Sequence, residues 1–73
     1  MKVWEFLYNY STWESAAATI SVHRTKRGAE MAMQFHKEAA RIEYEEDQKE
    51  YPSEFEFGHG EWWGIRETDL LDY

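Results

Sequence analysis

The residues of this sequence that could carry catalytic or metal chemistry are three histidines and fifteen acids. His23, His36 and His59 lie far apart, and no two have the helical i, i+4 spacing that presents a pair of ligands to zinc. The absence of cysteine excludes thiolate metal sites, disulfides and cysteine nucleophiles. No serine stands in a nucleophile-elbow pattern, and the glycine-containing turn 58–60 is too short to cradle a phosphate. We therefore expect a protein that is not an enzyme and that uses no metal or cofactor.

The acids are concentrated in the C-terminal part of the chain. Residues 1–42 carry four acids and six bases, whereas residues 43–73 carry eleven acids and two bases. Because carboxylates are mixed with aromatic residues there, the segment is either a solubilising helix end or an acidic surface that binds another protein. Such a surface could imitate nucleic acid phosphate and block a basic groove. The residues that we expect to contact the partner are Glu45, Glu46, Asp47, Glu54, Glu56 and Trp62.

A second cluster, of opposite charge, precedes the expected helix. Arg24, Lys26 and Arg27 surround Thr25, and a helix N-terminus attracts anions through its free amides. The alternative function is therefore a small anion- or nucleotide-binding domain that uses these three bases. They can also be simply exposed charges, or they can contact the acidic end of a second copy in a head-to-tail dimer.

The elements that position these residues are predicted from hydrophobic periodicity and from caps. Thr25 is the expected N-cap of one long amphipathic helix, and Pro52 forces that helix to stop. The predicted ranges are strands at 2–10 and 16–24, a helix at 26–48, a hairpin formed by 54–57 and 61–67, and a short tail at 68–73. The chain is thus expected to be one α+β domain over residues 1–73. Its small antiparallel sheet of three or four strands, in the order β-β-α-β(-β), would carry the helix on one face.

Two patterns predict which side chains face the core. The apolar stripe of the helix is formed by Ala32, Phe35, Ala39 and Ile42. On the polar face, Arg41 is spaced to pair with both Glu38 and Glu45. The adjacent Trp62 and Trp63 of the last strand must point to opposite faces of the sheet. At most one of them enters the core, so the open face of the sheet is a candidate surface for a partner or for a homodimer.

Composition limits the partners and the location. The net charge of −7 argues against direct binding to nucleic acid or to anionic lipid. No stretch approaches the roughly 20 apolar residues that span a bilayer, and Met1–Glu5 does not resemble a signal peptide. We expect a cytoplasmic protein that does not associate with membranes.

Three segments resemble those of small uncharacterised proteins encoded by bacteriophages and mobile elements. They are the first strand segment Lys2–Tyr10, the turn into the helix Thr25–Glu30, and the aromatic strand Trp62–Glu67. The resemblance covers most of the chain in outline and transfers no functional residue. It implies an accessory protein, short, acidic and non-enzymatic, that modulates a host protein.

Overall fold

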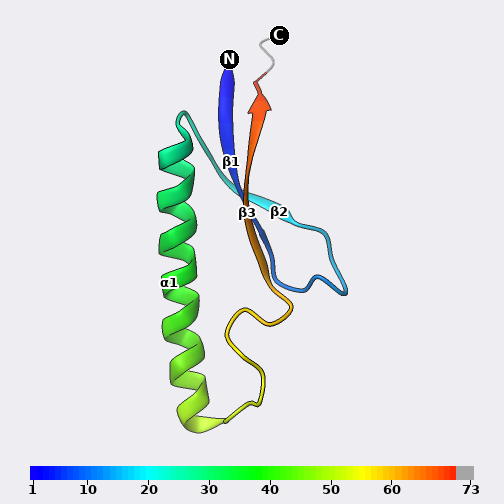
Figure 1. Ribbon diagram of the computed structural model, residues 1–73, viewed down its shortest axis with the longest axis vertical. Helices are drawn as coiled ribbons and strands as arrows, with labels where there is room; N and C mark the ends of the chain where they lie inside the picture. Colours follow the sequence, from blue (N-terminus) through cyan, green and yellow to red (C-terminus); the bar gives the residue numbers. More distant parts are fainter. Residues whose placement is uncertain (71–73) are drawn as a thin grey trace.

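The structure is a computed structural model that describes residues 1–70, and it confirms the expected α+β fold (Figure 1). Its elements are strand β1 (Lys2–Asn9), strand β2 (Ala18–His23), helix α1 (Lys26–Glu50) and strand β3 (Trp62–Asp69). The strands form one sheet in the order β2-β1-β3, with both outer strands antiparallel to β1. α1 lies along one face of this sheet, and the opposite face is open (Figure 1).

The central strand supplies most of the core because it is paired on both edges. Its side chains alternate between the two faces of the sheet. Phe6 points toward α1, where its ring meets His36 edge-on, and only 1% of its surface is exposed. Val3 and Leu7 are buried on the other face. The core is therefore thin and centred on β1.

α1 begins and ends where the sequence indicates. Thr25 has an extended backbone, and its hydroxyl oxygen accepts a hydrogen bond from the Gly28 amide at 3.0 Å. At the other end the Tyr51 amide donates to the Asp47 carbonyl at 2.7 Å. The helix extends two residues beyond the expected end at 48, since Pro52 disfavours helical geometry only at the residue directly before it.

The face of α1 that packs on the sheet differs from the prediction. Phe35 is 72% exposed and Ile42 is 47% exposed, so the stripe expected to be buried points away from the sheet. The helix instead packs through the side that contains Ala29, which is fully buried, and His36. The physical reason is volume: the sheet presents large rings, and a small alanine on the helix lets the two layers approach closely.

The expected hairpin is also wrong, because residues 54–57 form no strand. They belong to the irregular connection from α1 to β3, and β3 pairs with β1 along its whole length. Phe57 packs instead against Trp63 and Tyr44, with ring centroids 5.7 Å apart in both contacts. The free edge of β1 accepts the last strand directly, which leaves 54–57 without a pairing partner. β3 also takes in residues 68 and 69 of the expected tail, while residues 71–73 lie outside the described part of the chain.

Candidate functional site

The carboxylates predicted to bind a partner gather at one end of the molecule. Glu45, Glu46 and Asp47 lie near the end of α1, and Glu54 and Glu56 lie in the loop that follows. All five are exposed, and we call them the acidic end. In Figure 1 the last turns of α1 and this loop occupy the lower end of the molecule.

The loop is held against the helix by side chains that sequence reasoning did not single out. The Tyr44 hydroxyl donates to the Phe55 carbonyl at 2.6 Å. The Gln48 amide donates to the Ser53 carbonyl at 3.1 Å, and its oxygen accepts from the Ser53 amide. These bonds bring Glu54 close to the last turns of α1. Tyr44 and Gln48 are four residues apart on one helix side, which is the signal that could have marked them.

Aromatic rings are interleaved with these carboxylates. Phe55 is 54% exposed and stacks on His59, with ring centroids 4.6 Å apart. Tyr51, directly after the helix, is 78% exposed. The acidic end therefore combines negative charge with exposed apolar area.

Trp62 does not join the acidic end. Trp63 points toward α1, where its indole N–H donates to His36 Nδ1 at 3.0 Å. Trp62 is on the opposite face of the sheet, as the alternation predicted, and its ring covers Gly64 so closely that a Cβ there has no room. It is 43% exposed. The structure thus separates Trp62 from the carboxylates with which it was grouped.

The open face of the sheet is only partly apolar. Ile20 and Val22 on β2 are 49% and 55% exposed. Beside them Glu5 accepts hydrogen bonds from Thr68 and Arg66, each at 2.7 Å. These bonds lower the pKa of the Glu5 carboxyl below its usual range, and the bond from Thr68 has the largest effect. The charged and polar side chains near the centre of this face therefore have hydrogen-bond and ion-pair partners within the chain.

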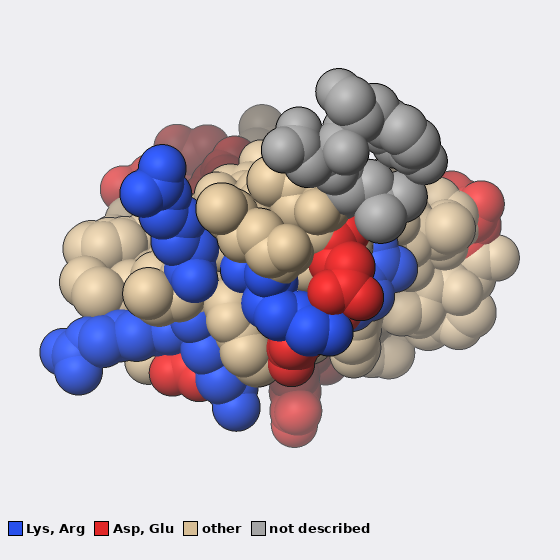
Figure 2. Space-filling model, turned by 90° about the horizontal axis from the view of Figure 1, so that it is seen from above, with Lys and Arg blue, Asp and Glu red and all other residues tan. Residues whose placement is uncertain are grey.

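The bases of the predicted anion site lie at the opposite end of the molecule. Arg24, Lys26 and Arg27 are exposed around the start of α1. Figure 2 looks at the molecule from above, and Lys and Arg side chains stand out on this end. The Gly28 amide donates a hydrogen bond to the Thr25 hydroxyl oxygen. One of the amides with which this helix N-terminus would bind an anion therefore already has a partner. Anion binding here stays a prediction.

The charges at both ends of α1 oppose its macrodipole. The first turn carries Lys26 and Arg27 and no acid, and the last turn carries Asp47 and Glu50 beside a single base, Lys49. Exposed charges at helix ends contribute about 0.3–1 kcal/mol each, favourable for acids at the start and for bases at the end. The charge pattern of this helix is therefore not accounted for by helix stability.

The outer face of α1, which points away from the sheet, carries an exposed apolar row. Met31, Phe35 and Ile42 are 46%, 72% and 47% exposed, and we call them the outer row. Met31, Gln34, Phe35 and Glu38 line a shallow hollow on this face.

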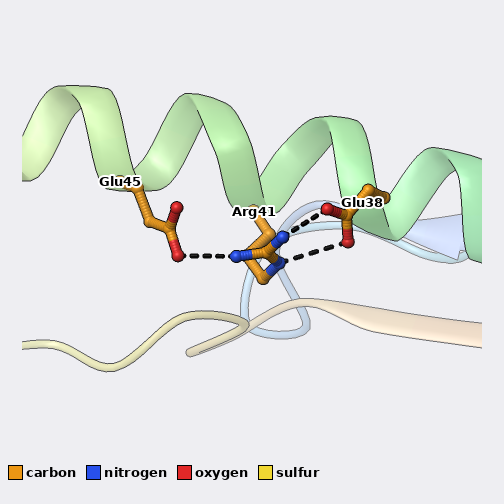
Figure 3. Close-up of polar contacts among 3 residues, drawn as sticks. All are labelled: Glu38, Arg41 and Glu45. Carbon is orange, nitrogen blue, oxygen red and sulfur yellow. Dashed lines mark hydrogen bonds and ion pairs between the residues drawn. The ribbon is translucent and has the colours of Figure 1, made fainter.

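The predicted ion pairs of α1 are confirmed. Arg41 reaches Glu45 at 2.6 Å and donates through Nε to Glu38 at 3.2 Å (Figure 3). The hydrogen bonds from the guanidinium hold the pKa of the Glu38 carboxyl below its usual range. One arginine thus neutralises much of the charge of two acids on the helix.

A polar cluster between α1 and the sheet contains the groups that most resemble catalytic ones. Next to His36, the Tyr8 hydroxyl donates to the Glu61 carboxylate. Burial, and then Glu61, raise the pKa of Tyr8 to about 12. Near neutral pH, Tyr8 is therefore a weaker proton donor than an ordinary tyrosine. The spacing of His36 from Ala29 and Ala40 on one helix side is the signal for its inward position.

Residues 1–70 contain no group of three or more His, Asp or Glu side chains placed to hold a metal ion. Within the same part of the chain, no helix combines the length and the apolar character needed to cross a membrane. No protein-family model matches the chain, and the comparisons with curated proteins and with solved structures give no match.

Proposed function

We propose that this chain is a non-catalytic interaction module that binds another protein. The observation that carries the proposal is the distribution of apolar side chains. Among residues 1–70, four hydrophobic residues are buried, whereas twelve large ones are exposed. A monomer with so small a core leaves apolar area that a partner can bury, and exposed apolar patches mark interaction sites.

The acidic end is the surface that we propose contacts the partner. Its carboxylates lie beside exposed rings, and the loop that carries Glu54 and Glu56 is fastened to α1 by Tyr44 and Gln48. Because these contacts order the loop before binding, less conformational entropy is lost when a partner docks. The proposed partner is a protein with a basic surface, such as one that binds nucleic acid, and charge complementarity would steer the encounter.

Two further parts of the proposal rest on the sequence. The resemblance to phage and mobile-element accessory proteins favours a modulator of a host protein, and the composition favours the cytoplasm. Trp62 is proposed as a separate contact, because it lies on the open face of the sheet. A tryptophan exposed in this way is enriched among the residues that dominate binding energy.

The experiment compares capture of partners by the wild-type chain and by a variant in which Glu46→Gln, Asp47→Asn and Glu54→Gln neutralise three charges of the acidic end. Each protein retained by the wild type is then purified, and its affinity is measured with both chains at two salt concentrations. We expect the neutralised variant to bind at least about tenfold more weakly, and the difference to shrink at high salt.

A matched control removes three negative charges elsewhere, through Glu14→Gln, Glu30→Gln and Glu67→Gln. This control should keep its affinity, because its substitutions lie outside the acidic end. Equal affinities of the wild type and the neutralised variant would refute the assignment of the acidic end. Equal weakening by both variants would show that net charge, and not this surface, determines binding.

A further inference from the structure

The outer face of α1 carries three large apolar side chains in one line. Met31, Phe35 and Ile42 are separated by four and seven residues, which places them on the same side of the helix. Phe35 is the most exposed of them, at 72%. In Figure 1 the sheet covers the other side of α1, and no other helix or strand of residues 1–70 lies beyond the helix. The row has the spacing by which one helix packs on another.

Charges of opposite sign lie near the two ends of this row. Arg27 lies four residues before Met31, and Glu46 lies four residues after Ile42. A second helix that lies antiparallel to α1 would bring Arg27 of each copy to Glu46 of the other. The same arrangement places each end of the macrodipole beside the opposite end of its neighbour, which relieves the unfavourable charges described above.

We propose that the outer face of α1 is the interface of an antiparallel homodimer, in which α1 of one copy packs along α1 of a second copy. Placing Met31 opposite Ile42 of the second copy fixes the register of the two helices. Arg27 then lies near Glu46 of the second copy, whereas Lys26 extends over the Trp4 ring of its own copy, with its Nζ 5.8 Å from the ring centroid. A two-fold axis repeats the Arg27–Glu46 pair at the other end, as a self-complementary interface requires.

The middle of the interface is compatible with this register. Phe35 lies near Glu38 of the second copy, and that carboxylate is already held by Arg41 of its own helix (Figure 3). The methylene groups of Glu38 can therefore lie against the ring without leaving a charge unpartnered. The hollow between Met31 and Phe35 gives a side chain of the second copy a place to enter.

The other candidate for self-association, the open face of the sheet, fits a second copy less well. Glu5 and Arg66 would be buried by such a contact, and burying an ion pair carries a desolvation cost. The outer face of α1 carries an ion pair of its own, Glu38–Arg41, so its advantage is the highly exposed Phe35 beside a hollow and not a lack of charge. It is also long enough: 25 residues at about 1.5 Å each make a helix of about 37 Å, so the contact can extend over most of the molecule.

The dimer does not rest on the proposed function. It engages Glu46 and leaves Asp47, Glu54 and Glu56 for another protein. The test of the dimer needs the purified chain alone. The dimer proposal can therefore fail while the binding of another protein is confirmed, and partner binding can fail while the dimer is confirmed.

The experiment is sedimentation of the purified chain from about 1 μM to about 1 mM, the range in which weak to moderate interfaces dissociate. We expect a monomer–dimer equilibrium that Phe35→Ala weakens by on the order of tenfold or more. Far-UV circular dichroism at the lowest concentration should show no loss of helix, because Phe35 is largely exposed in the single chain.

Charge reversal tests the antiparallel orientation. Arg27→Glu alone and Glu46→Arg alone should each weaken the dimer by on the order of tenfold, because each places like charges at both ends of the interface. An equimolar mixture of these two variants should regain wild-type affinity, since every end of the mixed dimer again joins a base and an acid. Glu14→Arg, which makes the same change in net charge as Glu46→Arg, is the control and should have no effect.

Three results would overturn the proposal. The first is a chain that stays monomeric over the whole concentration range. The second is a dimer that survives Phe35→Ala and is lost with Val22→Lys, because the open face of the sheet would then be the interface. The third is a mixture of the two charge variants that associates no better than either variant alone, which excludes antiparallel packing.

Discussion

Replacement of Asn9 by alanine should destabilise the fold, because the Asn9 side chain organises the connection from β1 to β2. Asn9 ends β1 and is 8% exposed. Its amide donates to the Ser15 carbonyl at 2.9 Å. Its oxygen accepts from the Ser11 amide at 3.0 Å and from the Ser15 hydroxyl at 2.9 Å. One side chain thus holds both ends of the turn.

The magnitude follows from these three hydrogen bonds. Each contributes about 0.5–1.5 kcal/mol, and water can reach part of this loop, so Asn9→Ala should lower the free energy of unfolding by about 2 kcal/mol. A chain of 73 residues has a total stability of about 4–11 kcal/mol. The change should therefore reduce the melting temperature by about 8–16 °C.

The assay is urea unfolding followed by tryptophan fluorescence and by far-UV circular dichroism, at a concentration where the chain is monomeric. Asn9→Asp keeps the acceptor and loses the donor to Ser15, so it should lie between the wild type and Asn9→Ala. Ser15→Ala removes one bond to Asn9 and should cost about 1 kcal/mol. A loss of less than about 0.5 kcal/mol for Asn9→Ala would refute the reasoning, because surface substitutions have effects of that size.

Raising the pH should destabilise the protein through Tyr8, since its pKa of about 12 in the fold exceeds the ordinary value of 10.0. The contribution of its neutral hydroxyl is complete below pH 10 and is lost toward pH 12, and Tyr8→Phe should remove this step from the urea midpoint measured against pH. At the acidic side, the lowered pKa of Glu5 means that its contribution is present above the ordinary value of 4.5 and is lost as the pH falls below it. Glu5→Gln should flatten the stability profile there, and an unchanged profile would contradict the hydrogen bonds assigned to Glu5. Gly58→Ala and Gly60→Ala should each cost about 1–2 kcal/mol, because both glycines have a positive φ, of 84° and 75°. Gly60→Ala should cost more, since the ring of Trp13 occupies the space that its Cβ would need, and equal melting temperatures would refute this contact.

Local signals in the sequence determined the elements of this fold. The strand-forming run at the start, the Thr25 cap and the Pro52 stop each act over a few residues, and the structure has β1, α1 and the end of α1 where these signals place them. The opposite orientation of Trp62 and Trp63 was likewise fixed by the pleat of a strand. The proposed carboxylates were found from composition, because a charge-rich segment after a long helix is visible without any fold.

The tertiary structure decided which side of α1 faces the sheet. α1 has two sides with apolar residues, and periodicity alone favoured the one with Phe35 and Ile42. β1 and β3 present large rings to the helix. These rings select the side of α1 with Ala29 and His36, because the small Ala29 allows close approach and the His36 ring packs against Phe6.

Strand pairing and surface grouping were decided at the same level. Residues 54–57 alternate like a strand, yet the free edge of β1 takes β3 and leaves them in a loop that Tyr44 and Gln48 fasten to the helix. That loop joins Glu54 to the acidic end, while the pleat of β3 removes Trp62 from it. Sequence fixes what each segment can form, because caps, turns and periodicity are local. Which faces meet depends on volumes and free edges contributed by residues far apart in the chain, and only the assembled fold brings those together.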